Sequence, residues 1–146
     1  MSLLRLLSVP VSSLAYLLDT NIAIHLRDAE LSILDRVDAL SGEIYLSVVS
    51  VVELEGGVNQ NPKTAEERRR LLNQLLVSLI ILPFERREAI EYGRIVSRIG
   101  FLRSRILDRM IAAQAIITGA TLITMNAPDF RDIPGLTLEI WPSPHA

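Results

Sequence analysis

The sequence has no cysteine, one tryptophan and only two histidines, His25 and His145, among its 146 residues. The lack of cysteine excludes a disulfide framework, a thiolate zinc site and a cysteine nucleophile. It also fits the reducing environment of the cytoplasm, where we expect the protein to act. A histidine-based zinc site is disfavoured as well, because His145 is one residue from the C-terminus and His25 fits a helix face.

Hydrophobic runs of transmembrane length are also missing, so we expect no membrane partner. Residues 1–14 are mildly apolar, but Ser8, Pro10 and two further serines interrupt them. We therefore interpret residues 1–14 as an N-terminal extension and not as a targeting signal. Hydrophobic residues make up 49% of the chain, which is enough for residues 15–146 to form one domain with a substantial core.

The formal net charge of −2 does not indicate a nucleic-acid-binding protein. Fourteen of the fifteen basic residues are arginines, however, and most of them lie between Arg68 and Arg109. Arginine binds phosphate in a bidentate fashion, so a local arginine surface is compatible with nucleic-acid binding. For any single arginine we favour the simpler interpretation of a solvated helix face.

Strand and helix patterns alternate along the chain. Five short apolar runs predict strands at residues 15–19, 44–48, 79–82, 121–124 and 136–141. Helical spacing and capping signals predict helices at residues 21–27, 31–40, 51–58, 64–78, 85–99 and 106–118. Thr64 and Glu67 form a capping-box pattern at the start of the fourth helix. Together these patterns predict an α/β fold whose mostly parallel sheet is covered on both faces.

Three acidic residues, Asp19, Glu53 and Asp108, lie in separate apolar segments at equivalent places in this alternation. A charge beside so much apolar surface costs several kcal/mol (roughly) unless it is compensated. The carboxyl ends of parallel strands meet at one edge, so we expect the three carboxylates to converge there. Oxygen ligands of this kind suit Mg²⁺ or Mn²⁺, and a bound metal ion would activate water for hydrolysis of a phosphodiester.

Each acid also has a structural explanation. Asp19 is a good N-cap for the helix that follows it. Glu53 would form a buried ion pair with an arginine, and Asp108 would cap its helix or pair with Arg105 or Arg109. Taken one at a time, these alternatives stay open, whereas the joint placement of the three acids favours a shared site.

Small polar residues accompany the acids. Thr20 and Asn21 are candidates to hold a ligand water or to orient Asp19, and Thr124 lies at the end of a predicted strand. For Ser50 we favour ordinary capping and turn chemistry. The pair Gly56–Gly57 either permits close packing of a neighbouring element or marks the end of a helix.

Four segments in order resemble the PIN-domain family, and within it the VapC-type toxins of toxin–antitoxin pairs. They are Leu17-Leu18-Asp19-Thr20-Asn21, Ser47-Val48-Val49-Ser50-Val51-Val52-Glu53-Leu54, Leu107-Asp108-Arg109-Met110-Ile111-Ala112-Ala113-Gln114-Ala115 and Leu122-Ile123-Thr124-Met125-Asn126-Ala127-Pro128-Asp129-Phe130. The resemblance covers about residues 15–141. Each motif alone is weak, but four in order with suitable spacing are fairly specific.

This resemblance implies a single-domain α/β/α sandwich and a Mg²⁺- or Mn²⁺-dependent endoribonuclease. Carried over by motif, Asp19, Glu53 and Asp108 are the metal-binding acids, and Asn126 occupies the fourth polar position of the catalytic set. A neutral side chain at Asn126 argues against a second, strongly bound metal ion. Asp129 is a candidate to assist, and its structural alternative is to cap the turn before Phe130.

The resemblance also implies a homodimer that is neutralised by a small cognate antitoxin and contacts operator DNA only through that antitoxin. The implied substrate is structured RNA. Because Arg103 and Arg105 lie close to Asp108 in sequence, we expect them to contact RNA phosphates. Two alternatives remain: a regulatory protein of the same fold with little nuclease activity, working in a DNA-bound complex, and a housekeeping RNA-processing nuclease.

Overall fold

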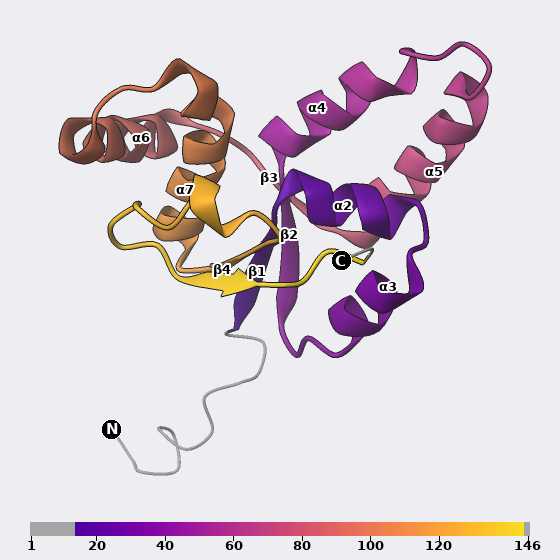
Figure 1. The fold of residues 1–146 in the computed structure, drawn as a ribbon, viewed down its shortest axis with the longest axis horizontal. Helices are drawn as coiled ribbons and strands as arrows, with labels where there is room; N and C mark the ends of the chain where they lie inside the picture. Colours follow the sequence, from indigo (N-terminus) through magenta and orange to yellow (C-terminus); the bar gives the residue numbers. More distant parts are fainter. Residues whose placement is uncertain (1–13, 145–146) are drawn as a thin grey trace.

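The computed structural model describes residues 14–144, so nearly all of the predicted N-terminal extension, as well as His145, lies outside the described residues (Figure 1). Strands and helices alternate along the chain, and the symbol η marks short 3-10 helices. The elements are β1 (Ala15–Leu18), α2 (Thr20–Arg27), α3 (Leu31–Asp38), β2 (Glu43–Ser47), α4 (Val48–Val58), α5 (Ala65–Ser78), β3 (Ile80–Leu82), α6 (Arg86–Ile99), η2 (Arg103–Arg105), α7 (Ile106–Thr118), β4 (Thr121–Thr124), η3 (Ala127–Asp129) and β5 (Leu138–Ile140).

The five strands form one sheet in the order β3-β2-β1-β4-β5, and every neighbouring pair is parallel. The predicted α/β class with a parallel sheet is therefore confirmed. The chain runs outward from β1 to β3 on one side and then crosses to β4 on the other side. The strand order thus reverses between β1 and β4, which is the place where open α/β sheets bind ligands, beyond the carboxyl ends of the strands.

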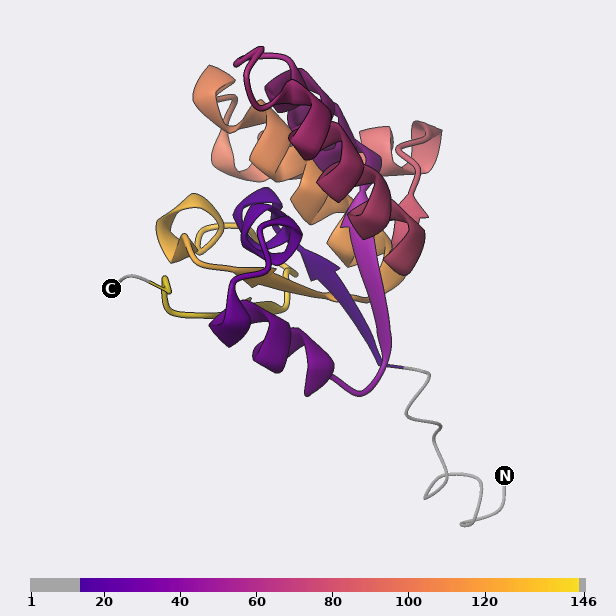
Figure 2. The ribbon, with the colours of Figure 1, turned by 90° about the vertical axis from the view of Figure 1, so that its right-hand side faces the viewer.

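Helices cover both faces of the sheet, giving the three layers of an α/β/α sandwich (Figures 1 and 2). Consecutive residues of β1 point to opposite faces because side chains alternate along a strand. Leu18 packs in a core with Ile22 of α2 and Leu72 of α5, whereas Leu17 packs in a second core with Ile111 of α7. All five side chains are at most 1% exposed, so both faces of the sheet are shielded from solvent.

Helix α4 begins at Val48, earlier than the predicted start at residue 51, and follows β2 without a loop. Its run of β-branched valines is typical of a strand, which explains the wrong boundary. Ser47 ends the strand and caps the helix, because its Oγ accepts a hydrogen bond from the backbone N–H of Val49 at 2.9 Å. Ser50, for which we favoured capping, instead lies inside the helix.

The predicted capping box at Thr64 and Glu67 is also wrong. The Thr64 side chain makes no capping hydrogen bond, and Glu67 pairs with Arg70 one turn later. A capping box does form at the start of α6, where the backbone N–H of Glu85 donates to Glu88 Oε2 at 3.0 Å. Both patterns satisfy the same spacing rule, so the spacing alone does not distinguish them.

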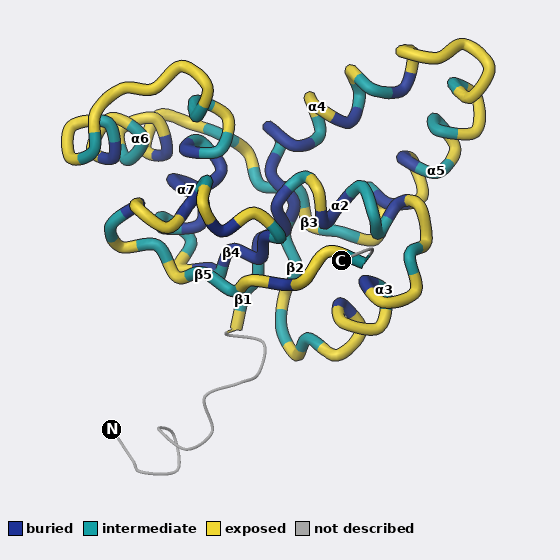
Figure 3. Tube along the Cα trace, in the orientation of Figure 1, coloured by how far each residue is buried: buried dark blue, intermediate teal, exposed yellow. Residues whose placement is uncertain are grey.

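Helices α4 and α5 form a hairpin that extends beyond the carboxyl ends of the strands (Figure 1). Its far end is exposed, while buried positions gather around the sheet (Figure 3). A Cβ at Gly56 or Gly57 would meet no atom within 4 Å, so these glycines do not allow a close approach and instead mark the end of α4. None of the helices within residues 14–144 combines the length and hydrophobicity that a bilayer span requires.

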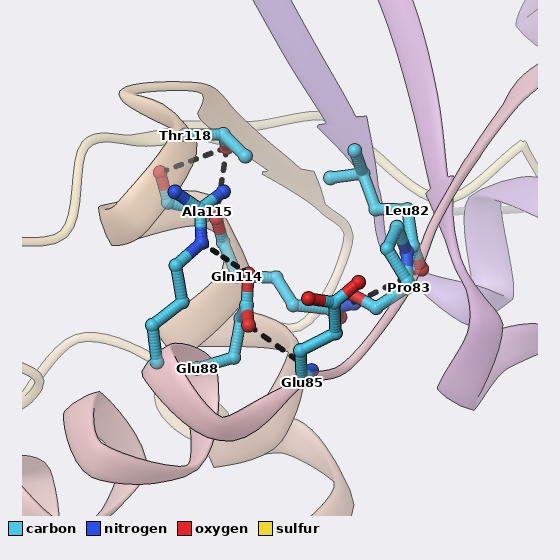
Figure 4. A network of polar contacts seen from close by, with 8 residues as sticks. Leu82, Pro83, Glu85, Glu88, Gln114, Ala115 and Thr118 are labelled. Atoms are coloured by element: carbon cyan, nitrogen blue, oxygen red, sulfur yellow. Dashed lines mark hydrogen bonds and ion pairs between the residues drawn. The ribbon is translucent and has the colours of Figure 1, made fainter.

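The buried side chain of Gln114 ties α7 to the ends of two strands (Figure 4). Its Nε2 donates to the carbonyl oxygens of Leu82 at 3.1 Å and Pro83 at 2.9 Å, and its Oε1 accepts from Ser47 Oγ. Gln114 is 1% exposed, so these contacts are shielded from water. The amide therefore fixes α7, and with it Asp108, against the carboxyl edge of the sheet.

Candidate active site

Asp19 is placed at the switch point of the sheet, between the end of β1 and the start of α2. Its Oδ1 accepts from the backbone N–H of Thr20, and its Oδ2 accepts from Thr124 Oγ1, both at 2.8 Å. The first bond is the expected N-cap of α2. The second bond joins β1 to β4 across the point where the strand order reverses. Asp19 is only 6% exposed, so both bonds compensate a buried carboxylate.

Glu53 lies in the second turn of α4 and is exposed, so the alternative of a buried ion pair is wrong for this residue. Thr20 Oγ1 donates to Glu53 Oε1 at 2.8 Å and lies 2.7 Å from Ser50 Oγ. A hydroxyl carries a single proton, so Ser50 must donate to Thr20 when Thr20 donates to Glu53. Ser50, which is fully buried, thereby helps to orient Glu53.

Asp108 lies in the first turn of α7, and Asp129 lies in η3. The guanidinium group of Arg105 lies between these two carboxylates. Arg105 Nη1 lies 3.7 Å from Asp108 Oδ2 and forms an ion pair with Asp129 Oδ1. Of the two arginines that we considered as partners of Asp108, Arg105 is therefore the nearer one. Arg109 points elsewhere and donates to the carbonyl oxygen of Gly100 at 2.7 Å.

Asn126 lies beside the site but does not line it. Its backbone N–H donates to Thr124 Oγ1 at 2.9 Å, and its side-chain Nδ2 donates to Asp129. Thr124 therefore connects Asn126 to Asp19, and Asp129 connects it to Arg105. Asn126 therefore contacts Asp129 through its side chain. Asp129 also pairs with Arg105, so the contacts of Asp129 go beyond the turn-capping role that was its structural alternative.

These residues border one cleft of about 400 Å³ at the carboxyl edge of the sheet. The predicted residues that line it are Asp19, Thr20, Asn21, Glu53, Asp108 and Asp129. These residues come from four separate segments of the chain. They meet because the strands are parallel, so that the segments that follow them lie at the same edge of the sheet. Arg103, which we expected to contact RNA, is exposed on η2 and does not line the cleft.

Burial and neighbouring carboxylates raise the pKa values of Asp19 and Asp108. Burial raises the pKa of Asp19 above its usual value, and the charges of Glu53 and Asp129 add to this, while the hydrogen bond from Thr124 opposes it. Burial also raises the pKa of Asp108, to about 6, with further increases from the charges of Asp19 and Asp129. Arg105 acts in the opposite direction on Asp108. The cleft therefore carries excess negative charge that a cation would relieve.

The chemistry of the donor set fits a hard divalent cation. Asp19, Glu53 and Asp108 supply only oxygen ligands, and each Asp19 oxygen keeps a lone pair after its hydrogen bond. Within residues 14–144, no three Asp, Glu or His side chains are arranged to hold one ion together. Mg²⁺ commonly uses one or two carboxylates and completes its shell with water and substrate phosphate, so a full protein cage is not required.

Several residues at the cleft were not singled out from the sequence. Arg27, Gln60 and Arg68 line it together with the acids. Arg27 is buried and bound to Asp28, with 2.9 Å between Nε and Oδ1. Arg68 follows a surface-like helical pattern, and no local signal shows that α5 returns alongside α4 to bring it to the cleft.

The PIN-domain family model matches residues 16–136, and the chain belongs to this family. It is 31% identical to "Ribonuclease VapC2" of Rickettsia felis over 132 residues, covering 86% of this chain and 97% of that protein. It is 25% identical to "tRNA(fMet)-specific endonuclease VapC" of Shigella flexneri, covering 88% of this chain and 98% of the relative. A crystal structure of VapBC2 from Rickettsia felis, bound to a DNA fragment of its promoter, has 30% identity and a TM-score of 0.79, with 88% and 99% of the two chains covered.

Proposed function

We propose that this protein is a metal-dependent endoribonuclease that acts as the toxin of a toxin–antitoxin pair. The observation that carries the proposal is the cleft at the switch point of the sheet, where Asp19, Glu53, Asp108 and Asp129 converge. Relatives that match nearly their whole length are named as VapC ribonucleases and tRNA-specific endonucleases. The shared PIN family and the near-complete coverage of these relatives support the same reaction class for this chain.

Asp19, Glu53 and Asp108 are the candidate ligands for Mg²⁺ or Mn²⁺. One or two of these carboxylates would bind the ion directly, and water and substrate phosphate would complete its shell. A metal bound there would neutralise charge on the phosphodiester and lower the pKa of a water molecule for hydrolysis. Thr124 orients Asp19, and Thr20 with Ser50 orients Glu53 through the hydrogen bonds described above. Asn126 holds Asp129, and Asp129 in turn holds Arg105 beside Asp108.

The partners follow from the same proposal. The solved VapBC neighbours are toxin–antitoxin complexes, and two of those with high similarity are bound to DNA. We propose that this chain forms a cytoplasmic homodimer, binds a small antitoxin over the cleft and reaches operator DNA through that antitoxin. Two relatives are named for tRNA(fMet), which makes initiator tRNA the first structured RNA to test.

The test is incubation of antitoxin-free protein with total RNA and with initiator tRNA, in Mn²⁺, Mg²⁺ or chelator. Asp19→Asn is the matched variant, because the amide keeps the side-chain shape but removes its charge. Discrete fragments that require both metal and Asp19 are the expected result. Folded wild-type protein that cleaves neither RNA would contradict the proposal and favour the regulatory, DNA-bound alternative. Cleavage without growth arrest on expression would favour a housekeeping nuclease.

A further inference from the structure

Three consecutive arginines on α5 have different surroundings. Arg69 Nη1 donates to Glu55 Oε2 at 2.9 Å, and Arg70 Nε donates to Glu67 Oε2 at 3.0 Å. Arg68 has no carboxylate partner among residues 14–144; its Nη1 instead donates to the carbonyl oxygen of Gly57 at 3.2 Å. Its positive charge is therefore the one in this run that no acid neutralises.

The position of Gly57 places this charge at the cleft. Glu53 and Gly57 are four residues apart on α4, so they lie on the same face of the helix and about 6 Å apart along its axis. Arg68 lines the same cleft as the carboxylates. The cleft thus has an acidic region at Glu53 and a cationic region one helical turn farther along α4.

The other arginines near the acids are already engaged. Arg27 lines the cleft, but Asp28 holds its guanidinium through two hydrogen bonds, at 2.9 and 3.3 Å. Arg105 is paired with Asp129. Arg68 is half-buried and uses one of its five N–H donors on Gly57, which fixes the guanidinium and leaves a donor edge available. An edge of this kind matches two oxygens of a phosphate.

We propose that Arg68 is a phosphate-binding residue that holds the RNA backbone next to the phosphodiester positioned at the carboxylates. This inference rests on the proposed ribonuclease function and adds a second contact point for the strand. A cation on that side offsets the repulsion between the RNA backbone and the acidic region of the cleft. It also defines the path of the strand, from the carboxylates along α4 toward the α4–α5 hairpin (Figure 1).

Direct binding measurements test this role without hydrolysis. Fluorescein-labelled oligo(U) RNA and initiator tRNA are titrated in chelator, at several salt concentrations, with the wild type, Arg68→Gln, Arg68→Lys and Arg70→Gln. Arg70→Gln removes the same charge from the same helix, but at a residue that is exposed and does not line the cleft. Melting curves of each variant establish that it is folded.

Arg68→Gln should weaken RNA binding about tenfold and make the slope of log K against log salt shallower by about 0.7, the value for one lost contact to a single strand. Arg68→Lys should keep the salt slope but bind more weakly, because the charge remains and the fork is lost. Arg70→Gln should bind as the wild type does. The lysine variant also tests the proposal if the glutamine variant does not fold.

The failures are distinguishable. If the wild type binds RNA and Arg68→Gln has the same affinity and salt slope, the role of Arg68 is wrong and the ribonuclease proposal stands. If the wild type binds neither RNA probe, both proposals fail. If Arg68→Gln binds RNA normally but loses affinity for the antitoxin, the residue binds an acidic side chain of that protein and the phosphate assignment is overturned.

Discussion

Three carboxylates at the cleft, Asp19, Glu53 and Asp108, each have a polar partner nearby. Asp19 is held by a threonine from a neighbouring strand, Glu53 by a threonine from a neighbouring helix, and Asp108 faces an arginine. The hydrogen bond from Thr124 compensates the charge of Asp19, which is buried and would otherwise be costly. The partners also orient the carboxylate oxygens before any ligand binds.

The first prediction concerns Asp108→Asn and pH. The pKa of Asp108 is about 6 in the folded protein, against its usual 3.8, because of burial and the nearby charges of Asp19 and Asp129. The folded state therefore binds this proton more tightly than the unfolded state. The contribution of Asp108 to stability is complete below the lower value and is lost as pH rises through the higher one.

An amide does not titrate, so the melting temperature of Asp108→Asn relative to the wild type should rise between about pH 4 and pH 7 and then level off. Thermal melts in chelator across this range measure the difference. Asp35→Asn, on the exposed face of α3, controls for the loss of one negative charge. A difference for Asp108→Asn that does not change with pH would contradict the prediction.

Thr124→Val should destabilise the protein by about 1–3 kcal/mol, because it removes the donor to buried Asp19 and the acceptor for the N–H of Asn126. Urea denaturation measures the change in the free energy of unfolding. Thr124→Ser keeps the hydroxyl and should lose much less. A loss for Thr124→Val that is no larger than the loss for Thr124→Ser would contradict the prediction, because the hydroxyl would then contribute no more than the methyl group that serine lacks.

The acids of the site could be predicted from the sequence, but their partners could not. Asp19, Glu53 and Asp108 each stand out as a charge in an apolar segment. Thr124 is 105 residues from Asp19, and their hydrogen bond depends on which strands become neighbours in the sheet. Ser50 and Arg68 resemble ordinary helix residues in the sequence. Only the packing of α4 against α2 and α5 brings Ser50 to Thr20 and Arg68 to the cleft.

At the scale of elements, the predicted boundaries are wrong where one sequence pattern fits two kinds of structure. The valines of residues 48–52 fit a strand as well as a helix, and the cap at Ser47 decided for the helix. Helix α7, by contrast, has the predicted bounds at both ends. Gly119 ends it in the left-handed conformation, with φ of 69°, which a glycine adopts without strain.

Gln114→Met should lower the free energy of unfolding by about 1–3 kcal/mol. The methionine fills a similar volume but leaves the buried carbonyl oxygens of Leu82 and Pro83 without their donor. Gln74→Met is the matched control, because Gln74 is an exposed helical glutamine with no such contacts; its effect should stay within about 0.5 kcal/mol. Urea denaturation measures the free energy of unfolding of both variants. Similar losses would show that the hydrogen bonds of the buried Gln114 amide do not contribute to stability.

At the scale of the whole molecule, the α/β/α architecture could be predicted because strand and helix patterns alternate cleanly. The strand order β3-β2-β1-β4-β5 was not predicted, since no local signal says on which side of β1 the chain places β4. That choice creates the switch point at Asp19 and Thr124. The carboxylates therefore meet because of the strand order of the whole sheet, and not because of a local sequence signal.

The excess negative charge of the cleft leads to a prediction for the intact protein. Mn²⁺ should stabilise the wild type, because a ligand that binds only the folded state contributes about 2.7 kcal/mol at a hundred times its dissociation constant. For a chain of this length that corresponds to a rise of about 5–10 °C in melting temperature. The rise should be larger at pH 7 than at pH 5, because Asp108 must lose its proton, with its pKa of about 6, to bind a cation well.

Melting curves with Mn²⁺ and with chelator, in the absence of RNA, measure this effect independently of catalysis. Asp19→Asn should lose most of the rise, whereas Arg68→Gln should keep it, because Arg68 lies at the cationic part of the cleft. The two variants thus separate metal binding from phosphate binding. If Asp19→Asn gained the same stability from Mn²⁺ as the wild type, the ion would bind elsewhere and the convergence of the acids would need another explanation.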